Sequence, residues 1–526
     1  MKNRFVIILL IIFLLLSSCS TGTDVSSVNV SITHDGKIEN LSVPSNSTIS
    51  QAIAIAGISF GYLDRVEPNK SNLVSENLII KIIRVQETFI LEETVLPFES
   101  QTIKNESLPT GQTILIQAGH NGMQSITYRV VTEDGIEVSR SITKIEITQP
   151  AQPEIIMIGV QSDFRAVTIT GVIAYISSAN AWLMESTTGN RRALVSTGDL
   201  DGRIFSISPD RKWLLFSRSN SGDDESLINS LWVISLTDAD AQPLPLTIGG
   251  IPIKNVVHYA EWVPGKTQTI AYSTVEPRPT APGWQANNDL QIMKFNDTGA
   301  SSDFKTIIAT NPGGIYGWWG TVYCWSPDAS EIAYARPDGI GLIDSKTGSL
   351  NPIIEFTPYN TQSDWAWVSG ITWSPSNHAL LYFVKPASDE SINSGFDLNA
   401  AVIGQNDIIN LKNNVGLFAY PTTSPANQGG VFKIAYLSAI LPDQSETSKY
   451  ALHIMDRDGS NDQKLYPGEG VQGLEAQQVV WSPLSDSDSA LFIAFIAQGN
   501  MMFVNPTTGE LNQITGDGSI SRIDWK

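Results

Sequence analysis

The chain has 526 residues and a formal net charge of −20 at pH 7. A surface this acidic repels phosphate backbones, so no nucleic acid is expected among its partners. Its two cysteines, Cys19 and Cys324, are too few for a disulfide framework or a cysteine-rich metal site, and its length exceeds what one hydrophobic core normally holds. Several domains and no cofactor or metal are therefore expected.

The N-terminus has the layout of a secretory signal. Two of the first four residues are basic, and Phe5–Leu16 is apolar but too short to cross about 30 Å of hydrocarbon as a helix. The next residues, Leu16-Ser17-Ser18-Cys19, resemble the lipobox of bacterial lipoproteins, which implies lipid on Cys19 and anchoring to the membrane on its outer side, at the cell surface or in the periplasm. The alternative is an ordinary secretory signal with a chance cysteine. The expected segments are a signal peptide at 1–18 and a lipidated tether at 19–27.

Residues 28–85 are predicted to form a small β-grasp domain. Ile49–Ala56 has apolar residues three and four apart, as in a helix, with Ser47 or Thr48 as its N-cap and Gly57 at its end. Strand patterns with a hairpin at Asp35-Gly36 surround this helix. The stretch, with its Asp35-Gly36-Lys37 and Asp64–Pro68, resembles the ubiquitin-like domain of cell-wall-active bacterial proteins.

Residues 86–160 are predicted to form an elongated β module. Ile126–Val130 and Ile142–Ile147 alternate apolar and polar residues, as half-buried strands do. Glycine permits positive φ in the turns between such narrow strands. The stretch resembles the five-glycine (G-five) domain, which implies binding to peptidoglycan or another N-acetylglucosamine-containing glycan; the alternative is a spacer without a ligand. Its candidate glycines are Gly111, Gly119, Gly122, Gly135 and Gly159.

A motif recurs through residues 161–526. A Trp-Ser-Pro or similar triplet precedes a short apolar strand, and successive copies lie 48 to 63 residues apart. This period, with four short strands in each repeat, predicts a β-propeller. The first repeat, Val172–Val195, lacks an inner strand, which the orphan Ile523–Trp525 can supply, so seven blades are favoured. Six or eight also fit, because the copy at Ser424 is degenerate. The repeats, and Ile454–Asn461 in particular, resemble TolB-like and WD-repeat-like propellers.

Catalytic motifs are absent from the sequence. None of the five histidines precedes a glutamate, no Gly-x-Ser-x-Gly elbow occurs, and Cys324 flanks a motif tryptophan and is expected to be buried. We therefore expect that the chain is not an enzyme. The alternative is an extracytoplasmic hydrolase that cleaves glycan or peptide with a site in the propeller funnel.

Aromatic residues are the best candidates for ligand contacts in the propeller. They lie just before inner strands, a position that borders the central funnel, where flat rings stack on sugars or contact peptide side chains. The alternative is packing between blades. The candidates are Trp318, Trp319, Trp365 and Trp367, and the proline-rich insertion Glu276–Gln285 is a second candidate contact. The sequence thus predicts an extracellular, membrane-anchored scaffold that contacts cell-wall glycan and a partner of the propeller, either a protein or a glycan.

Overall fold

The computed structural model describes residues 26–105, 111–159, 164–220, 227–375, 379–388, 395–405, 407–484 and 491–526. The predicted signal peptide and the predicted lipidation at Cys19 lie outside these residues. The chain divides into two compact units: one contains the residues up to Ser100 and Ala118–Glu154, and the other contains Gln101–Gln117 and Ile155–Lys526. Neither helix in the described ranges has the length and apolar character needed to cross a bilayer.

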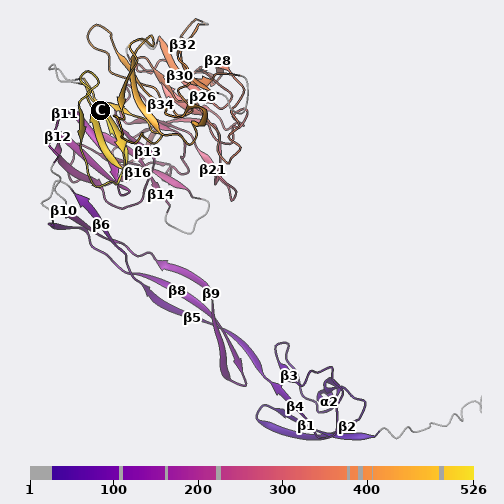
Figure 1. The fold of residues 1–526 in the computed structure, drawn as a ribbon. Helices are drawn as coiled ribbons and strands as arrows, with labels where there is room; N and C mark the ends of the chain where they lie inside the picture. Colours follow the sequence, from indigo (N-terminus) through magenta and orange to yellow (C-terminus); the bar gives the residue numbers. More distant parts are fainter. Residues whose placement is uncertain are drawn as a thin grey trace, which may run out of the picture. The chain divides into compact units, whose positions relative to one another are not determined.

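The first unit begins with a four-stranded mixed sheet packed on one helix (Figure 1). The order is β2-β1-β4-β3, with β1 parallel to β4. The Thr48 hydroxyl accepts a hydrogen bond from the Gln51 N–H at 3.3 Å, and the Gln51 side chain accepts one from the Thr48 N–H at 2.8 Å, so the predicted helix and a predicted cap are confirmed. The elements are β1 (Ser27–His34), β2 (Lys37–Pro44), α2 (Ile49–Ile55), β3 (Arg65–Glu67) and β4 (Leu78–Ile83).

The second sheet of this unit has three long antiparallel strands in the order β5-β8-β9. Every residue of β5 pairs with β8, from Val85 opposite Glu133 to Leu96 opposite Gly122. The strand β9 is exposed along its whole length, so the backbone ladder holds this sheet together more than an apolar core does. The strands are β5 (Val85–Leu96), β8 (Gly122–Glu133) and β9 (Ile136–Gln149).

The second unit contains a small sheet that shares a core with the propeller. Its strand order is β6-β10-β7, and its buried Ile103 and Ile155 belong to the same apolar cluster as Trp525 at the end of the chain. Part of the stretch predicted as the five-glycine module therefore packs with the propeller. The strands are β6 (Ser100–Asn105), β7 (Thr113–Gln117) and β10 (Glu154–Gly159).

The rest of the second unit is a β-propeller of seven blades (Figure 1). Six blades have four antiparallel strands: β13–β16 (Leu200–Ile207, Trp213–Ser219, Asn229–Ser235, Leu244–Pro245), β19, β20, β23 and β24 (Ala260–Trp262, Thr269–Tyr272, Leu290–Phe295, Ser301–Ile308), β25–β28 (Val322–Trp325, Ile332–Arg336, Gly339–Ile343, Leu350–Glu355), β29–β32 (Ile371–Trp373, Leu380–Pro386, Phe396–Val402, Ile408–Lys412), β33–β36 (Thr422–Thr423, Lys433–Ala439, Tyr450–Asp456, Gln463–Tyr466) and β37–β40 (Val480–Trp481, Ile493–Ala497, Asn500–Val504, Leu511–Gln513). Smaller elements are the ribbons β17–β18 (Thr247–Ile248, Ile251–Pro252) and β21–β22 (Val275–Pro277, Trp284–Ala286), and the 3-10 helix η1 (Pro442–Gln444). The predicted mainly-β fold with seven blades is confirmed.

The two ends of the propeller sequence meet in the seventh blade. The C-terminal strand β41 (Ile520–Trp525) pairs antiparallel with β11 (Thr168–Ser177), and β11 pairs with β12 (Asn180–Val195). Ile523 lies opposite Tyr175 in this ladder, and Figure 1 shows the C-terminus beside β11. The predicted closure is thus confirmed, and it removes the open sheet edges that an unclosed ring would expose.

The repeated motif has a structural reason at each of its residues. Each serine hydroxyl accepts the backbone N–H that starts the next strand, at 3.0 to 3.2 Å, which closes the hairpin after the proline. The tryptophan rings lie between blades, and Trp262 and Trp481 donate their indole N–H to backbone oxygens of the preceding blade. The five serine–donor pairs are Ser208–Trp213, Ser326–Glu331, Ser374–Leu380, Ser424–Lys433 and Ser482–Phe492.

Candidate ligand site in the propeller channel

The inner strands of all seven blades enclose a central cavity of about 970 Å³. Each inner strand runs along the channel, so the residues just before and within the repeated motif contribute its wall. This volume is that of a site for a small molecule or a short peptide segment. The cavity belongs wholly to the second unit.

One side of the channel is aromatic. The rings of Trp365 and Phe418 lie 5.9 Å apart, and those of Phe418 and Tyr420 also lie 5.9 Å apart and nearly parallel, at 23°. Tyr420 has a φ of 41°, which is costly for a residue with a side chain. A Cβ on Gly370 would lie 3.1 Å from the Tyr420 ring, so the ring would have to shift by a few tenths of an ångström to accept a side chain there.

Two arginines and a second group of aromatic rings also line or border the channel. Arg203 places its guanidinium 5.1 Å from the ring centroid of Trp284, a cation–π contact, and Trp284 packs on Trp319 with centroids 5.2 Å apart. Arg522, on β41, donates one long hydrogen bond of 3.4 Å to the backbone oxygen of Arg203. The channel therefore has cations and aromatic rings among its lining groups.

Glu261, on β19, is a carboxyl group in the channel wall. Burial raises the pKa of Glu261 to about 7, although Lys526 and hydrogen bonds from Tyr259 and the Trp325 backbone act in the opposite direction. The Tyr259 hydroxyl lies 3.5 Å from this carboxylate. A carboxyl group with such a pKa exists in both protonation states near neutral pH.

Two further polar groups of the wall are held in their neutral forms. Burial lowers the pKa of His258 to about 4, and neither ring nitrogen has a hydrogen-bond partner among the described residues. Burial likewise raises the pKa of the Cys324 thiol well above its usual value, so a reactive thiolate is disfavoured. The side chain expected to be buried is in fact only partly covered, because Cys324 lines the channel.

The structure separates the four predicted tryptophans. Trp319 and Trp365 line the channel and are partly exposed, whereas Trp318 lies edge-on against Trp319 and outside the lining. Trp367 also contributes to the lining, but it is only 1% exposed and donates its indole N–H to the Leu417 oxygen at 2.8 Å, so its ring mainly packs between blades. Trp318 and Trp367 are therefore poorer candidates than the sequence suggests.

Several residues that line the channel were not predicted from the sequence. Arg203, Arg522, Phe418 and Tyr420 carry no local motif, and the folded ring brings them together from distant repeats. The insertion Glu276–Gln285, in contrast, was a candidate contact from the sequence. Its tryptophan, Trp284, packs on Trp319, which lines the channel.

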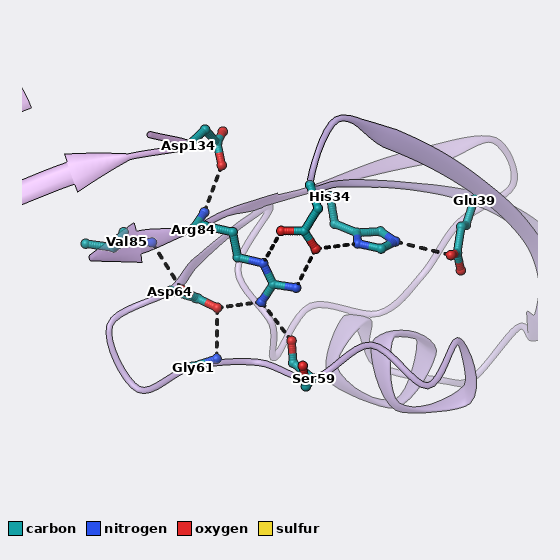
Figure 2. Close-up of polar contacts among 9 residues, drawn as sticks. His34, Glu39, Ser59, Gly61, Asp64, Arg84, Val85 and Asp134 are labelled. Atoms are coloured by element: carbon teal, nitrogen blue, oxygen red, sulfur yellow. Dashed lines mark hydrogen bonds and ion pairs between the residues drawn. The ribbon is translucent and has the colours of Figure 1, made fainter. Parts of the chain in front are cut away.

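A second polar cluster lies in the first unit, where the β-grasp sheet continues into β5 (Figure 2). The Arg84 guanidinium donates to Asp35 at 2.8 Å, to Asp64 at 2.7 Å and to the Ser59 backbone oxygen at 2.7 Å. Its backbone N–H donates to Asp134 in the β8–β9 turn at 2.9 Å. Because these contacts occupy the charged groups, the cluster is a structural junction.

The five candidate glycines occupy two kinds of position. Gly111 and Gly135 have positive φ, as predicted. Gly119 and Gly122 do not; a Cβ there would lie 2.3 Å from the Phe98 ring and 2.2 Å from the Gln149 backbone oxygen, respectively. Gly159 exchanges backbone hydrogen bonds with the turn at residues 111 and 112. Close packing, as well as turn geometry, therefore requires glycine in this module.

Comparison with known proteins identifies the module but not the whole chain. Residues 88–161 match the G5 domain family. Resuscitation-promoting factor Rpf2 of Corynebacterium glutamicum is 26% identical over 161 residues, or 30% of this chain and 42% of that protein. Resuscitation-promoting factor RpfB of Mycolicibacterium smegmatis is 23% identical over 137 residues, or 26% of this chain and 37% of that protein. The chain thus spans less than half the length of these relatives.

Solved structures resemble the two parts of the chain separately. The G5 domain of IgA1 protease is 25% identical and covers 15% of this chain and 94% of its own, with a TM-score of 0.12. A puromycin-hydrolysing peptidase of Mycobacterium tuberculosis is 12% identical and covers 67% of this chain and 53% of its own, with a TM-score of 0.40. The propeller domain of the Trilobed protease of Pyrococcus furiosus is 12% identical and covers 60% of this chain and 84% of its own, with a TM-score of 0.34.

These peptidases correct one expectation. We expected from missing motifs that the chain is not an enzyme, and proteins that carry a propeller of this kind include peptidases, so that expectation is withdrawn. The family match, in contrast, confirms the predicted five-glycine module: residues 88–161 are a G5 domain.

Proposed function

We propose that this chain is a cell-wall-associated lipoprotein of the bacterial envelope. In this proposal lipid on Cys19 anchors it outside the cytoplasm, the G5 domain contacts N-acetylglucosamine-containing glycan, and the propeller channel recognises a ligand. The observation that carries the proposal is the G5 domain at residues 88–161, and the likeness to resuscitation-promoting factors over 161 and 137 residues supports it.

The surface of the G5 sheet supports glycan contact. Phe89 on β5 is 63% exposed, and the Tyr128 ring on β8 lies under the Arg140 guanidinium, 5.3 Å from the ring centroid. Flat rings open to solvent can stack on the apolar faces of sugars. Because this sheet has so little core of its own, its side chains are available for contact along β5 and β9.

Co-sedimentation with peptidoglycan sacculi tests the wall contact. The chain from residue 20 onward, which keeps every described residue, should pellet with sacculi and be released by chitin oligosaccharides. Phe89→Ala should lower the retained fraction several-fold, whereas Phe304→Ala, at a phenylalanine 42% exposed on the propeller, should not. Retention equal to a non-binding control protein would show that the wall contact is wrong.

A second candidate function is hydrolysis of glycan or peptide in the channel. The observation that favours it is Glu261, whose pKa burial raises to about 7 inside a cavity of about 970 Å³. A general acid needs a carboxyl group that is protonated near neutral pH. Release of soluble fragments from sacculi or peptides by the wild-type chain, and its loss in Glu261→Gln, would support this function; no release by the wild type would reject it.

A further inference from the structure

Arg522 is a cation in the channel without a matching anion. A guanidinium has five N–H donors, and among the described residues the one hydrogen bond of this side chain is the 3.4 Å contact with the Arg203 oxygen. Among the described residues, no carboxylate lies within ion-pair distance of it. A Cβ on Gly202 would lie 3.5 Å from the Arg522 Cγ, so the stem of the arginine packs on a glycine, and the residue lines the cavity.

The acidic groups that act electrostatically on Arg522 are already engaged elsewhere. Asp524 accepts the Ile207 N–H at 2.6 Å and the Trp525 N–H at 2.9 Å. Asp201 accepts the Asn229 side-chain amide at 2.8 Å and the Arg203 N–H at 3.0 Å. These hydrogen bonds hold the two carboxylates within or between their blades. The carboxylates therefore do not occupy the N–H donors of the Arg522 guanidinium.

The charges around Arg522 agree with a guanidinium that has no anionic partner within ion-pair distance among the described residues. The surrounding channel wall lowers the pKa of Arg522, although the residue itself is exposed to the solvent of the channel. The negative charges of Asp524 and Asp201 partly oppose this effect. A bound anion would form with this guanidinium the paired, charge-assisted hydrogen bonds that guanidinium groups make with carboxylates.

Tyr420 and its stack provide a place for the body of such a ligand. Tyr420 and Arg522 both line the channel, and they lie within electrostatic range of each other. The Tyr420 hydroxyl makes no hydrogen bond among the described residues, and its backbone stays at a φ of 41° to hold the ring there. Behind it the rings of Phe418 and Trp365 continue the aromatic wall.

We propose that the propeller channel binds a ligand with a carboxylate group, which Arg522 holds while the body of the ligand packs on Tyr420 and its stack. This inference rests on the proposed ligand recognition by the channel and names its chemistry. A sugar acid and the C-terminus of a short peptide both present such a carboxylate beside a body that can lie on aromatic rings.

Matched pairs of probes test the inference by isothermal titration of the chain from residue 20 onward. N-acetylmuramic acid differs from N-acetylglucosamine by a carboxylate-bearing lactyl group, and N-acetyl-Ala-Ala differs from its C-terminal amide by one charge. We expect at least one acid to bind ten-fold or more tightly than its neutral partner. The pair that shows this preference identifies whether the carboxylate comes from a sugar acid or from a peptide C-terminus.

Variants connect the preference to Arg522. Arg522→Gln should abolish the preference for the acid, Arg522→Lys should retain part of it, and Arg457→Gln, at an exposed arginine outside the channel, should leave it unchanged. If the acid and neutral probes bind equally and Tyr420→Ala loses both, the inference that the ligand needs a carboxylate is wrong. Ligand binding in the channel would still be supported. No binding of any probe at 10 mM would overturn the carboxylate inference. Sacculus retention is measured separately, so its failure does not affect this result.

Discussion

The indole N–H of Trp373 donates a hydrogen bond to the backbone oxygen of Cys324, 3.0 Å away on the preceding blade. The two residues are 49 positions apart, close to one repeat. The same contact joins Trp262 to Ser206 at 2.9 Å and Trp481 to Thr422 at 3.3 Å. In these three copies the motif tryptophan fills the space between blades and also donates to a backbone carbonyl of the preceding blade, whereas the indole N–H of Trp325 has no partner among the described residues.

Trp373→Phe should destabilise the propeller by more than the loss of ring volume alone. The substitution leaves the Cys324 oxygen without its donor, which costs about 1–3 kcal/mol when the group is buried. Trp182 provides a matched control, because it is also 3% exposed but its indole N–H has no hydrogen-bond partner among the described residues. Denaturant unfolding should show a larger loss for Trp373→Phe than for Trp182→Phe; equal losses would contradict a role for the hydrogen bond.

The sequence was sufficient to predict the propeller because its signals are local and repeated. Each Trp-Ser-Pro copy specifies a tryptophan between blades, a serine that closes a hairpin and a proline that ends a strand. Ile523–Trp525, a copy without a following strand, indicated closure for the same reason, and pairing with β11 confirms it. Because the motif repeats, the fold can be predicted from the sequence even though the copy at Ser424 is degenerate.

The channel chemistry could not be predicted in the same way. Arg522 and Tyr420 are about 100 residues apart, and neither stands in a motif. The direction of a side chain also depends on packing: Trp365 and Trp367 are two positions apart, yet Trp365 packs beside the channel ring of Phe418 and Trp367 is buried among blade residues. Burial of Glu261 likewise depends on neighbours that only the closed ring supplies.

Two glycines of the G5 domain should respond differently to asparagine. Gly135 has a φ of 82° and open space around it, and asparagine tolerates the left-handed region, so Gly135→Asn should cost little. Gly122 has no such φ, but a Cβ there would lie 2.2 Å from the Gln149 oxygen, so Gly122→Asn should disrupt the pairing of β8 with β9. Hydrogen exchange along these strands measures the difference, and similar protection in both variants would contradict it.

Arg84 should couple the stability of the first unit to acid pH. Burial acts to raise the pKa of Asp64, but hydrogen bonds from the Gly61 N–H, Arg84 and the Val85 N–H outweigh it and lower that pKa below 3.8. A lowered folded-state pKa means that the stabilisation is present above pH 3.8 and is lost as the pH falls below it. Thermal melts of the wild type should therefore lose stability steeply below about pH 4.

Arg84→Met should be less stable at pH 7 and show a weaker acid dependence than the wild type. Arg65→Met is the control, because Arg65 is 56% exposed and pairs only with Glu133 at 2.8 Å among the described residues. Such exposed pairs contribute about 0–1 kcal/mol, so this variant should melt close to the wild type. An acid dependence unchanged in Arg84→Met would show that the cluster does not control it.

Glu261→Gln should stabilise the propeller at alkaline pH and have little effect in acid. Burial raises the pKa of Glu261 to about 7 in the folded chain, from an ordinary value of 4.5. The folded state therefore favours the protonated form: its advantage is complete below pH 4.5 and is lost as the pH rises through 7. Glutamine imitates the protonated group at every pH. Denaturant unfolding at pH 4 should give equal midpoints for the two chains, and at pH 8 a higher midpoint for the variant. A lower midpoint at pH 8 would mean that the ionised carboxylate stabilises the wall, through its contacts with Tyr259 and the Trp325 backbone.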